Sequence, residues 1–499
     1  MEQFLLISYI VCLSILTIFA SHGFVMVYHY MKHKKNTEPE LSLTSYPMVT
    51  VQLPLYNELY VVRRLIEASC AIDYPKDKLE IQVLDDSTDE TVEIVDRVVK
   101  EMKAKGHNIH HIRRSSRKGY KAGALKEGLK IAAGEFVAVF DADFVPRKEF
   151  LMKTIPYFAT DPKMGMVQTR WEHLNNEYSV LTRTQAIMLD GHFVIEQHSR
   201  NQAGYFIQFN GTGGVWRKAC IEDAGNWQAD TLTEDLDLSY RAQLRGWKFK
   251  YLKDFTSPAE LPADINALKS QQFRWTKGAI ETSRKLLPLV WKSKMPMRIK
   301  IHSTFHLTSN FCYPFIILAA LLNMPMTFIK HGGEFNAYFD FMSVFILAFV
   351  SSFLFYFYAQ KDVYEDWRRR MMLFPVFMGG SMGFSVNNTK AVLEGLFKYK
   401  TEFVRTPKYS IKEKKDSWKD KKYVGVKFSW VVIVEVLLAL YCLFGVFASL
   451  YYLEIAAIPF QMLFSWGFGS IAYLSIQQAW EAHKIRVGQL DVQTAMVTA

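Results

Sequence analysis

The feature that most constrains this sequence is a stretch near its start that lacks charged side chains. Residues 4–30, FLLISYIVCLSILTIFASHGFVMVYHY, contain no Lys, Arg, Asp or Glu. As a helix, this stretch is long enough to cross the hydrocarbon core of a bilayer, which is about 30 Å thick. A cleaved signal peptide is the alternative, but Met1-Glu2-Gln3 provides no basic residue and the apolar stretch is too long for one. We therefore expect a membrane helix within residues 1–30.

Four more apolar stretches of similar length lie after residue 306, and none lies within residues 31–300. They are residues 307–329, 337–360, 430–452 and 456–478. Because basic residues are enriched on the cytosolic side of membrane helices, Lys32, Lys34 and Lys35 place the block that follows them in the cytosol. The sequence therefore predicts an outside N-terminus, a cytosolic block over residues 31–300, and membrane helices within residues 301–499 that end with an inside C-terminus.

A shorter apolar piece, residues 371–386, interrupts this pattern. It lies between two loops rich in basic residues, so a single crossing there would put one of them on the wrong side. It also contains Pro375 and three glycines, which are unfavourable in a helix exposed to lipid. We interpret it as an interfacial or re-entrant segment packed against protein.

Charge and cysteine content argue against several other classes of protein. The 60 Lys and Arg against 49 Asp and Glu give a net charge of +11, but the excess lies in loops beside the apolar stretches. The positive-inside rule and anionic lipids explain that placement, so no nucleic-acid role is indicated. The 5 cysteines are far apart and form no Cys-x-x-Cys pair, which argues against a disulfide framework or a zinc site.

The cytosolic block alternates between strand-like and helix-like patterns. Short apolar runs predict strands over residues 48–53, 80–84, 108–112 and 136–140, and helical spacing predicts helices over residues 59–71, 89–104 and 120–132. This order predicts a mostly parallel sheet covered by helices, in which ligands bind beyond the carboxyl ends of the strands. No Gly-x-Gly-x-x-Gly follows the first strand and no Gly-x-x-x-x-Gly-Lys-Ser/Thr is present, which argues against dinucleotide-binding and P-loop folds.

Acidic pairs stand at two of these strand ends. Asp85-Asp86 ends the second strand, and Asp141-Ala142-Asp143 follows the fourth. The carboxylates of Asp141 and Asp143 are close enough to repel each other unless a cation lies between them, and a divalent ion that bridges to substrate phosphates is the natural partner. The alternative is a turn that uses each Asp for Asx hydrogen bonds.

Two further motifs carry weaker signals on their own. Thr233-Glu-Asp235-Leu-Asp237 has the pattern of a capped helix start with acidic residues in its first turn. Gln271-Gln-Phe-Arg274-Trp275 supplies an Arg suited to a pyrophosphate and a Trp suited to a sugar face. The same Arg and Trp are common as an interfacial anchor beside a bilayer. Taken alone, the first motif is better explained as a helix start and the second as an interfacial anchor.

Taken together and in this order, the motifs resemble those of glycosyltransferase family 2, and specifically the membrane-embedded cellulose synthase-like enzymes. The matching segments are Gln82-Val-Leu-Asp-Asp-Ser-Thr-Asp89, Gly119-Tyr-Lys-Ala-Gly-Ala-Leu-Lys-Glu-Gly128, Asp141-Ala-Asp143, Phe209-Asn-Gly-Thr-Gly213, Thr233-Glu-Asp235 and Gln271-x-x-Arg274-Trp275. They look most similar to the cellulose synthase-like A and C groups, which make mannan and glucan backbones. Phe403-Val-Arg-Thr-Pro-Lys408 also resembles the gating loop of cellulose synthases, with Arg405 in place of a Val.

The resemblance implies a fold and a role for individual residues. The fold is an α/β domain of the GT-A type over residues 31–300, fused to an α-helical multi-pass membrane domain, with the gating-loop-like segment at residues 400–410. On the donor side, Asp85 and Asp86 would hold the nucleoside, Lys121 and Arg274 would lie at the diphosphate, and Asp141 and Asp143 would bind Mg²⁺ or Mn²⁺. Asp235 would be the general base. The acceptor-binding residues would be Gln271, Trp275, Phe209, Asn210, Gly211 and Thr212, and the gating-loop residues would be Phe403, Thr406 and Lys408.

These roles predict a processive, inverting β-glycosyltransferase that uses UDP-glucose or GDP-mannose, extends a β-linked polysaccharide and secretes it through its membrane domain. A single base and no covalent nucleophile imply inversion. Two alternatives stay open: a non-processive lipid glycosyltransferase similar to ceramide glucosyltransferase, and a transporter with a cytosolic regulatory domain. Against the transporter, the apolar stretches contain almost no charges of the kind that mark ion pathways. The expected location is the Golgi in a eukaryote or the plasma or inner membrane in a bacterium, and the sequence identifies no protein partner.

Overall fold

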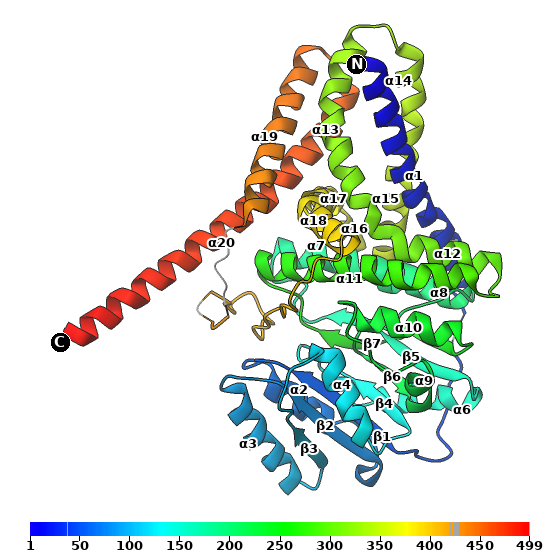
Figure 1. Ribbon diagram of the computed structural model, residues 1–499, viewed down its shortest axis with the longest axis vertical. Helices are drawn as coiled ribbons and strands as arrows, with labels where there is room; N and C mark the ends of the chain where they lie inside the picture. Colours follow the sequence, from blue (N-terminus) through cyan, green and yellow to red (C-terminus); the bar gives the residue numbers. More distant parts are fainter. Residues whose placement is uncertain (37, 420, 424–428, 499) are drawn as a thin grey trace.

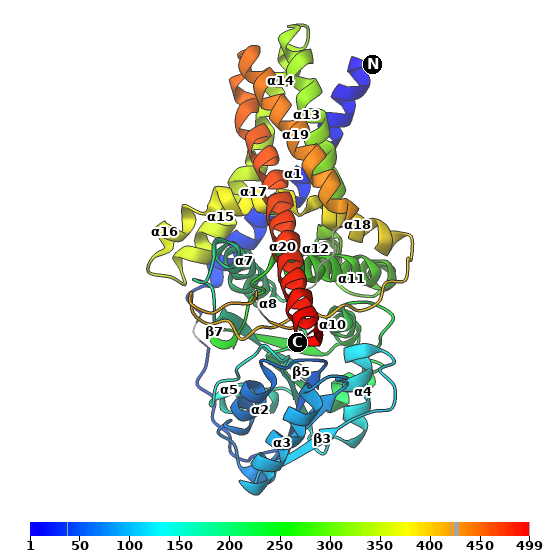
Figure 2. The same cartoon turned by 90° about the vertical axis from the view of Figure 1, so that its left-hand side faces the viewer.

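The computed structural model describes residues 1–36, 38–419, 421–423 and 429–498, and it has two parts along its long axis. A mixed α/β unit forms one end, and long helices form a bundle at the other end (Figure 1). The N-terminus lies at the tip of the bundle in both views, far from the α/β unit (Figures 1 and 2). The C-terminal part of the last helix projects away from the bundle (Figure 1).

The α/β unit is built on a seven-stranded sheet with the order β3-β2-β1-β4-β6-β5-β7. The first four strands pair in parallel and match the four predicted strands: β1 (Val49–Leu55), β2 (Leu79–Asp85), β3 (Asn108–Ile112) and β4 (Phe136–Val139). The last three are β5 (Met164–His173), β6 (Gly214–Arg217) and β7 (Lys248–Ala259). Strand β6 runs antiparallel to both of its neighbours, β4 and β5. The mostly parallel sheet is confirmed, and its last three strands were not predicted.

Helices cover both faces of the sheet because each has an apolar stripe. Helices α2 (Val62–Cys70) and α3 (Thr91–Ala104) bury Leu65 and Val95 in the core on one face. Helix α4 (Tyr120–Ile131) buries Leu125 in the core on the other face. These three helices are the predicted ones. The other helices of the unit are α5 (Phe150–Thr154), α6 (Pro156–Thr160), α7 (Val180–Asp190), α8 (His198–Gln202), α9 (Lys218–Asp223), α10 (Glu234–Leu244) and α11 (Ile265–Lys292).

Helices α7 and α11 lie between the sheet and the bundle (Figure 1). Helix α7 begins with a capping box, in which Ser179 and Thr182 each accept a hydrogen bond from the backbone of the other. Helix α11 is capped by the preceding Asp264, whose side chain accepts a hydrogen bond from the N–H of Ala267 over 2.8 Å. With 28 residues, α11 runs across the base of the bundle and carries the Gln271–Trp275 motif there.

Five helical segments are long and apolar enough to cross a membrane, judged by length and composition in the part of the chain that the structure describes. They are Glu2–His33, Met297–His331, Asn336–Lys361, Trp430–Tyr451 and Ile455–Lys484, and they coincide with the five predicted stretches. Their helices are α1 (Glu2–His33), α12 (Met297–Thr308), α13 (Cys312–His331), α14 (Asn336–Met342), α15 (Ile346–Lys361), α19 (Trp430–Tyr451) and α20 (Ile458–Thr498). Their orientation stays a prediction.

The apolar piece at residues 371–386 belongs to three short helices, α16 (Trp367–Met371), α17 (Phe374–Gly383) and α18 (Ser385–Leu396). Pro375 stands in the first turn of α17, where its missing N–H would be unpaired in any case. A Cβ atom on Gly383 would lie 2.3 Å from the carbonyl oxygen of Gly467 in α20. The glycine therefore permits a close contact between two helices, and the interfacial location of the piece stays a prediction.

Candidate active site

A pocket of about 160 Å³ lies at the carboxyl ends of β1, β2 and β4. Its other walls come from the start of α10, from α11 and from the segment between α18 and α19. Most of the residues predicted for the site meet here, although they are far apart in the chain. They are Asp86, Lys121, Asp141, Asp143, Asn210, Gly211, Asp235, Gln271, Arg274, Trp275, Phe403, Thr406 and Lys408.

Two lysines hold the carboxylates of the Asp141–Asp143 turn. The Nζ atom of Lys121 lies 2.5 Å from Oδ1 of Asp141, and Nζ of Lys408 lies 2.5 Å from Oδ2 of Asp143. The backbone N–H of Asp141 donates to Oγ1 of Thr212 over 2.9 Å, which anchors the turn from the core side. Among the described residues, neither carboxylate accepts a hydrogen bond from its own turn, so the Asx-turn alternative does not apply.

This pair of carboxylates fits a hard divalent cation. Each of them already holds a positive charge at 2.5 Å. Mg²⁺ in nucleotide sites is commonly bound by one or two carboxylates, while substrate phosphates and water complete its shell. No group of three or more His, Cys, Asp or Glu side chains in the described parts of the chain is placed to hold a metal ion. The remaining ligands of a metal here would therefore come from substrate and water.

Asp235 stands in the first turn of α10 and faces the pocket. The preceding Thr233 does not cap the helix with its side chain, because its hydroxyl group contacts that of Thr282 at 3.1 Å. Gly278 lets α11 approach this turn, since a Cβ atom there would lie 2.5 Å from Cγ2 of Thr233. A Cβ atom on Gly211, whose φ is +80°, would lie 3.0 Å from Oδ2 of Asp235. Capping by Thr233 therefore fails as an explanation of the Thr-Glu-Asp motif.

The surroundings of Asp235 shift its titration toward neutral pH. Burial raises the pKa of Asp235 to about 7, the carboxylate of Glu234 acts in the same direction, and Lys121 opposes both. Burial lowers the pKa of Lys121, but Asp141 and Glu234 more than offset this and leave it raised. A carboxylate with a pKa near the working pH, beside a permanently charged lysine, is suited to take up a proton from a substrate.

The predicted nucleoside side of the pocket is built around Asp86. The Nε and Nη2 atoms of Arg114 lie 2.7 and 2.5 Å from its two carboxylate oxygens. Beside this pair, the guanidinium of Arg117 lies 3.3 Å from the ring centroid of Tyr56. Aromatic rings and guanidinium planes both offer a stacking surface to a base. This wall of the pocket therefore suits a nucleobase.

Residues 399–411, which we call the lid segment, cross the pocket. Phe403 stacks on Tyr120 with ring centroids 5.5 Å apart. The guanidinium carbon of Arg274 lies 4.6 Å from the centroid of the Phe403 ring. The lid segment thereby connects the start of α4 with the Arg of the Gln271–Trp275 motif.

The far end of the lid segment is anchored to the carboxyl end of β7. The backbone N–H groups of Tyr409 and Ile411 both donate to Oε1 of Glu260 over 3.1 Å. The other carboxylate oxygen of Glu260 lies 3.3 Å from Nη2 of Arg64. Because Tyr409 and Ile411 are almost fully buried, the anchor holds Lys408 at the pocket.

Arg405, the residue that departs from the gating-loop pattern, pairs with Glu58 just after β1. Its Nη1 atom lies 3.3 Å from Oε2 of Glu58, and its guanidinium carbon lies 4.1 Å from the centroid of the Tyr423 ring. Burial raises the pKa of Glu58 to about 8, although Arg405 and Lys408 both act to lower it. Arg405 thus gives the lid segment a second charged contact with the strand ends.

Three residues predicted for the site lie outside the pocket. Asp85 is buried, and its carboxylate contacts the N–H of Ser87 at 2.8 Å and Nε2 of His111 at 2.9 Å. Phe209 packs in the core, and Thr212 is buried behind Asp141. The structure thus places the side chains of Asp85, Phe209 and Thr212 behind the pocket and not on its wall, and Thr212 supports Asp141, which does line it.

Other pocket residues were not singled out from the sequence. They include Tyr56, Glu58, Arg117, Trp171 and Glu234. The rule that ligands bind beyond strand ends could have found Tyr56 and Glu58, which directly follow the first strand. Glu234 lies inside the Thr-Glu-Asp motif. Trp171 and Arg117 carry no comparable signal, because only packing brings them to the pocket.

Comparison with known families identifies the class of this domain. Residues 47–278 match the family described as Glycosyltransferase like family 2. This segment contains the whole sheet, α10 and the Gln271–Trp275 part of α11. Residues 47–278 therefore form a glycosyltransferase family 2 domain, which confirms the family that the motifs resemble.

Curated relatives of the chain include plant proteins. Over 282 residues it is 44% identical to probable glucomannan 4-beta-mannosyltransferase 4 of Oryza sativa subsp. japonica, with 56% of this chain and 51% of the relative covered. Over 311 residues it is 40% identical to glucomannan 4-beta-mannosyltransferase 2 of Arabidopsis thaliana, with 60% of this chain and 58% of the relative covered. The chain thus spans somewhat more than half the length of these relatives.

A solved structure supports the fold. A mannosyltransferase from Pyrobaculum calidifontis, in complex with GDP-Man and Mn²⁺, has a TM-score of 0.54 at 18% identity and covers 78% of this chain and 100% of its own. At this identity the likeness shows the fold alone. It confirms the predicted GT-A type of α/β domain.

Proposed function

We propose that this protein is a membrane-bound, inverting β-glycosyltransferase that transfers mannose from GDP-mannose to a growing β-1,4-linked mannan or glucomannan chain. The observation that carries the proposal is Asp235, a carboxylate of raised pKa facing a pocket that also contains Asp141, Asp143, Lys121 and Arg274. The choice of donor and linkage follows the names of the plant relatives, which are 40% and 44% identical. UDP-glucose, the other donor that the sequence left open, is the competitor in the test below.

Asp235 would act on the acceptor. Its carboxylate would accept the proton of an acceptor hydroxyl group while that oxygen attacks the anomeric carbon of the donor sugar. Gly211 keeps the space beside Oδ2 of Asp235 open, because any side chain there would start 3.0 Å from that atom. A single base without a second carboxylate acting as nucleophile predicts inversion, so an α-linked donor gives a β-linked product.

Basic groups would hold the diphosphate of the donor. Lys121, Arg274 and Lys408 all line the pocket and would donate charge-assisted hydrogen bonds to the phosphate oxygens. Mg²⁺ or Mn²⁺ at Asp141 and Asp143 would supply further positive charge for the departing diphosphate. Asp86, fixed by Arg114, and the Tyr56–Arg117 pair would receive the base.

The acceptor side of the pocket carries side chains that suit a sugar. Trp275 offers an apolar face, while Gln271 and Asn210 offer amide groups that both donate and accept hydrogen bonds. Because Gln271 and Trp275 lie on α11 at the base of the bundle, the acceptor chain would leave the site toward the membrane helices.

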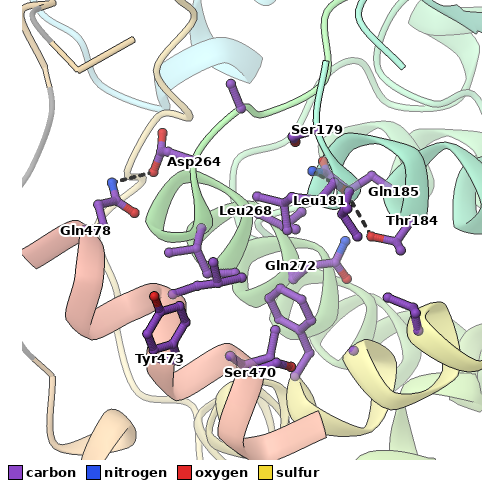
Figure 3. Close-up of a pocket in the computed structure, with 18 of the residues that line it drawn as sticks. Ser179, Leu181, Thr184, Gln185, Asp264, Leu268, Gln272, Ser470, Tyr473 and Gln478 are labelled. Atoms are coloured by element: carbon purple, nitrogen blue, oxygen red, sulfur yellow. Dashed lines mark hydrogen bonds between the residues drawn. The ribbon is translucent and has the colours of Figure 1, made fainter. Parts of the chain in front are cut away.

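A second cavity supports secretion of the product through the membrane domain. It has a volume of about 610 Å³ and lies between α7, α11, α17 and α20 (Figure 3). Its lining includes Trp466, Tyr473 and the amides of Gln272 and Gln478, which are groups that sugar rings and hydroxyls bind. Gln272 directly follows Gln271 on α11, so one helix borders both cavities.

The proposal includes an arrangement in the membrane. Residues 31–300 would lie on the cytosolic side, where nucleotide sugars are available, and residues 1–30 and 301–499 would hold the membrane helices. Residues 371–386 would lie at the interface. In a eukaryotic cell the location would be the Golgi membrane.

The test uses purified protein in lipid vesicles with radiolabelled GDP-mannose or UDP-glucose and Mg²⁺ or Mn²⁺. We expect a polymer from GDP-mannose that endo-β-1,4-mannanase degrades. Product made only from UDP-glucose would overturn the choice of donor. One sugar per lipid molecule would support the non-processive lipid glycosyltransferase, and the absence of both transfer and nucleotide-sugar hydrolysis would contradict an enzyme and favour a transporter.

A further inference from the structure

An irregular helical turn lies between α7 and α8. Residues Gly191–Gln197 form a π-helix of 7 residues. Such wide turns are rare within α-helices, and those that do occur often lie at functional sites. Because a π-helix bonds each residue to the fifth one along, it brings His192 and Gln197 to the same face, whereas an α-helix aligns residues three or four apart.

Both residues contact the side-chain amide of Asn210, which lines the catalytic pocket. Nε2 of His192 lies 2.9 Å from Nδ2 of Asn210, and Nε2 of Gln197 donates to Oδ1 of Asn210 over 2.6 Å. The turn that carries Asn210 also contains Gly211, the residue beside Asp235. The π-helix therefore holds an amide group next to the proposed base.

The backbone fixes the direction of every hydrogen bond in this group. Nε2 of Gln197 also donates to the carbonyl oxygen of Gln208 over 2.8 Å, so it must be the amide nitrogen. The Asn210 atom that faces it is then the oxygen, and the atom that faces His192 is the nitrogen. Nε2 of His192 is therefore the acceptor, and the ring proton lies on Nδ1.

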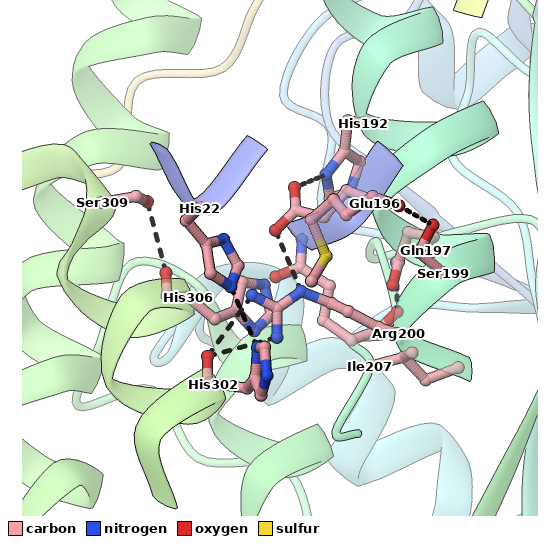
Figure 4. A network of polar contacts seen from close by, with 12 residues as sticks. His22, His192, Glu196, Gln197, Ser199, Arg200, Ile207, His302, His306 and Ser309 are labelled. Carbon is pink, nitrogen blue, oxygen red and sulfur yellow. Dashed lines mark hydrogen bonds and ion pairs between the residues drawn. The ribbon is translucent and has the colours of Figure 1, made fainter. Parts of the chain in front are cut away.

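Glu196 keeps His192 in this form. The Nδ1–H of His192 donates to Oε2 of Glu196 over 2.9 Å, and Nε of Arg200 lies 3.0 Å from Oε1 (Figure 4). Burial acts to raise the pKa of Glu196, but the hydrogen bond of His192 and the charge of Arg200 hold it well below its ordinary value. A charged carboxylate only accepts hydrogen bonds, so it retains the proton on Nδ1.

The series of contacts that links Asn210, His192, Glu196 and Arg200 continues to two membrane helices. Arg200 is almost fully buried, and its two terminal nitrogens lie 3.4 Å from the carbonyl oxygen of His302 in α12. Nδ1 of His302 lies 3.0 Å from Nε2 of His22 in α1 (Figure 4). The orientation of Asn210 is thus linked, through these side chains and the backbone carbonyl of His302, to helices at the base of the bundle.

One N–H of the Asn210 amide is bonded to His192, and the described residues offer no acceptor for the other. We propose that His192 and Glu196 are positioning residues, which hold Asn210 so that this second N–H donates to a hydroxyl oxygen of the acceptor sugar beside Asp235. The inference rests on the proposed function, because it requires a sugar acceptor in the pocket. It adds two residues that neither line the pocket nor belong to any motif that resembles the family.

The test measures the KM for a β-1,4-linked manno-oligosaccharide acceptor separately from the KM for GDP-mannose. We expect His192→Ala and Glu196→Gln to raise the acceptor KM by about tenfold, the value of one hydrogen bond, with the donor KM unchanged. His192→Gln should recover most of the loss, because a glutamine carbonyl oxygen reaches the position of Nε2. In the double variant His192→Ala/Asn210→Ala the acceptor KM should equal that of Asn210→Ala alone, since His192 acts through Asn210.

A matched control is His198→Ala, which removes another buried His from the adjacent helix without touching Asn210. Equal changes in acceptor KM for the two His variants, or effects of His192→Ala and Asn210→Ala that multiply in the double variant, would overturn the inference.

Solid-state ¹⁵N NMR of histidine-labelled protein identifies the tautomer of His192 and does not require the protein to be active. We expect the signal of an unprotonated Nε2 that disappears in His192→Gln. A protonated Nε2 in His192 would contradict the proposal, even if no transfer reaction were found. If the unmodified protein transferred no sugar, that result would instead count against the proposed function.

Discussion

The side chains of Lys408 and Asp143 form an ion pair with Nζ 2.5 Å from Oδ2, although 265 positions separate them in the chain. Lys408 belongs to the lid segment between α18 and α19, and Asp143 follows β4. The ion pair therefore closes the catalytic pocket with a residue that arrives from the segment between two helices of the bundle. It places a cation on the same carboxylate that fits a metal ion.

The first prediction concerns the lid segment. Removing the ammonium group in Lys408→Ala should release the segment and speed tryptic cleavage after Arg405, because lids belong to the less stable parts of a fold. GDP with Mn²⁺ should slow the cleavage of the unmodified protein. Lys415→Ala is the control, since Lys415 is exposed and, within the described part of the chain, forms an ion pair with Glu413 alone. A cleavage rate that neither Lys408→Ala nor the nucleotide changes would identify the segment as an ordinary linker.

The second prediction concerns the metal. EDTA should abolish transfer, and Mn²⁺ or Mg²⁺ added in excess should restore it. Asp143→Asn should lower activity in the same way, but Asp143 is only 7% exposed, so the melting temperature of the variant must be compared with that of the unmodified protein. Asp141→Asn is the companion variant, because its carboxylate is more exposed than that of Asp143. Full activity in EDTA would remove the metal from the proposal.

The third prediction concerns the base. Asp235→Asn keeps the size of the side chain but cannot accept a proton, so transfer should fall by about 10²- to 10⁴-fold while GDP binding is retained. Asp237 is unsuitable as a control, because its buried carboxylate pairs with Arg241 and Lys285. Asp230→Asn is the better control, since Asp230 is exposed and its one ion pair among the described residues is with Lys285. If Asp235→Asn turned over normally, another group would have to take the proton.

The fourth prediction concerns pH. Burial and Glu234 raise the pKa of Asp235 to about 7, and only the ionised carboxylate can accept a proton. The turnover rate should therefore fall about tenfold for each pH unit below 7 and should level off above it. The measurement is a rate profile at saturating donor and acceptor. An inflection near the ordinary pKa of Asp, about 4, would show that Asp235 is not buried beside Glu234 during turnover.

The fifth prediction concerns the coupling of α11 to the bundle. Nζ of Lys269 in α11 lies 2.8 Å from Oε2 of Glu435 in α19 and 2.8 Å from Oγ of Ser475 in α20. Glu435 is fully buried, so Lys269→Ala or Glu435→Ala alone should cost about 3–5 kcal/mol of stability by leaving one charge unpaired. The double variant Lys269→Met/Glu435→Leu should be more stable than either. Thermal unfolding in detergent measures this, and additive single effects would argue against a coupled pair.

Local patterns were enough to predict about half of the sheet and all candidate membrane helices. Strands β1 to β4 and helices α2 to α4 follow from short apolar runs and helical spacing, which depend only on neighbouring residues. The three later strands gave no such signal. Strand β6 has four residues and forms only because β4 and β5 accept it on either side.

The candidate site could likewise be predicted only in part from the sequence. The sequence placed Asp86, Asp141 and Asp143 at strand ends, because the carboxyl ends of parallel strands meet at one edge of a sheet. It could not separate Asp86 from Asp85, whose side chain turns into the core toward His111. Adjacent residues of a strand point to opposite faces, and only the packing of the complete sheet decides which face holds the pocket.

By itself, then, the sequence determined the candidate membrane helices, the first half of the sheet and the acidic groups at its edge, because each depends on residues close together in the chain. Only the tertiary structure decided that Lys408 meets Asp143, that Arg405 meets Glu58, and that His192 and Gln197 hold Asn210. It also set the raised pKa of Asp235, since that shift comes from burial and from Glu234 and Lys121 at its side. Burial and charge proximity are properties of the folded chain, and no spacing of residues along the sequence specifies them.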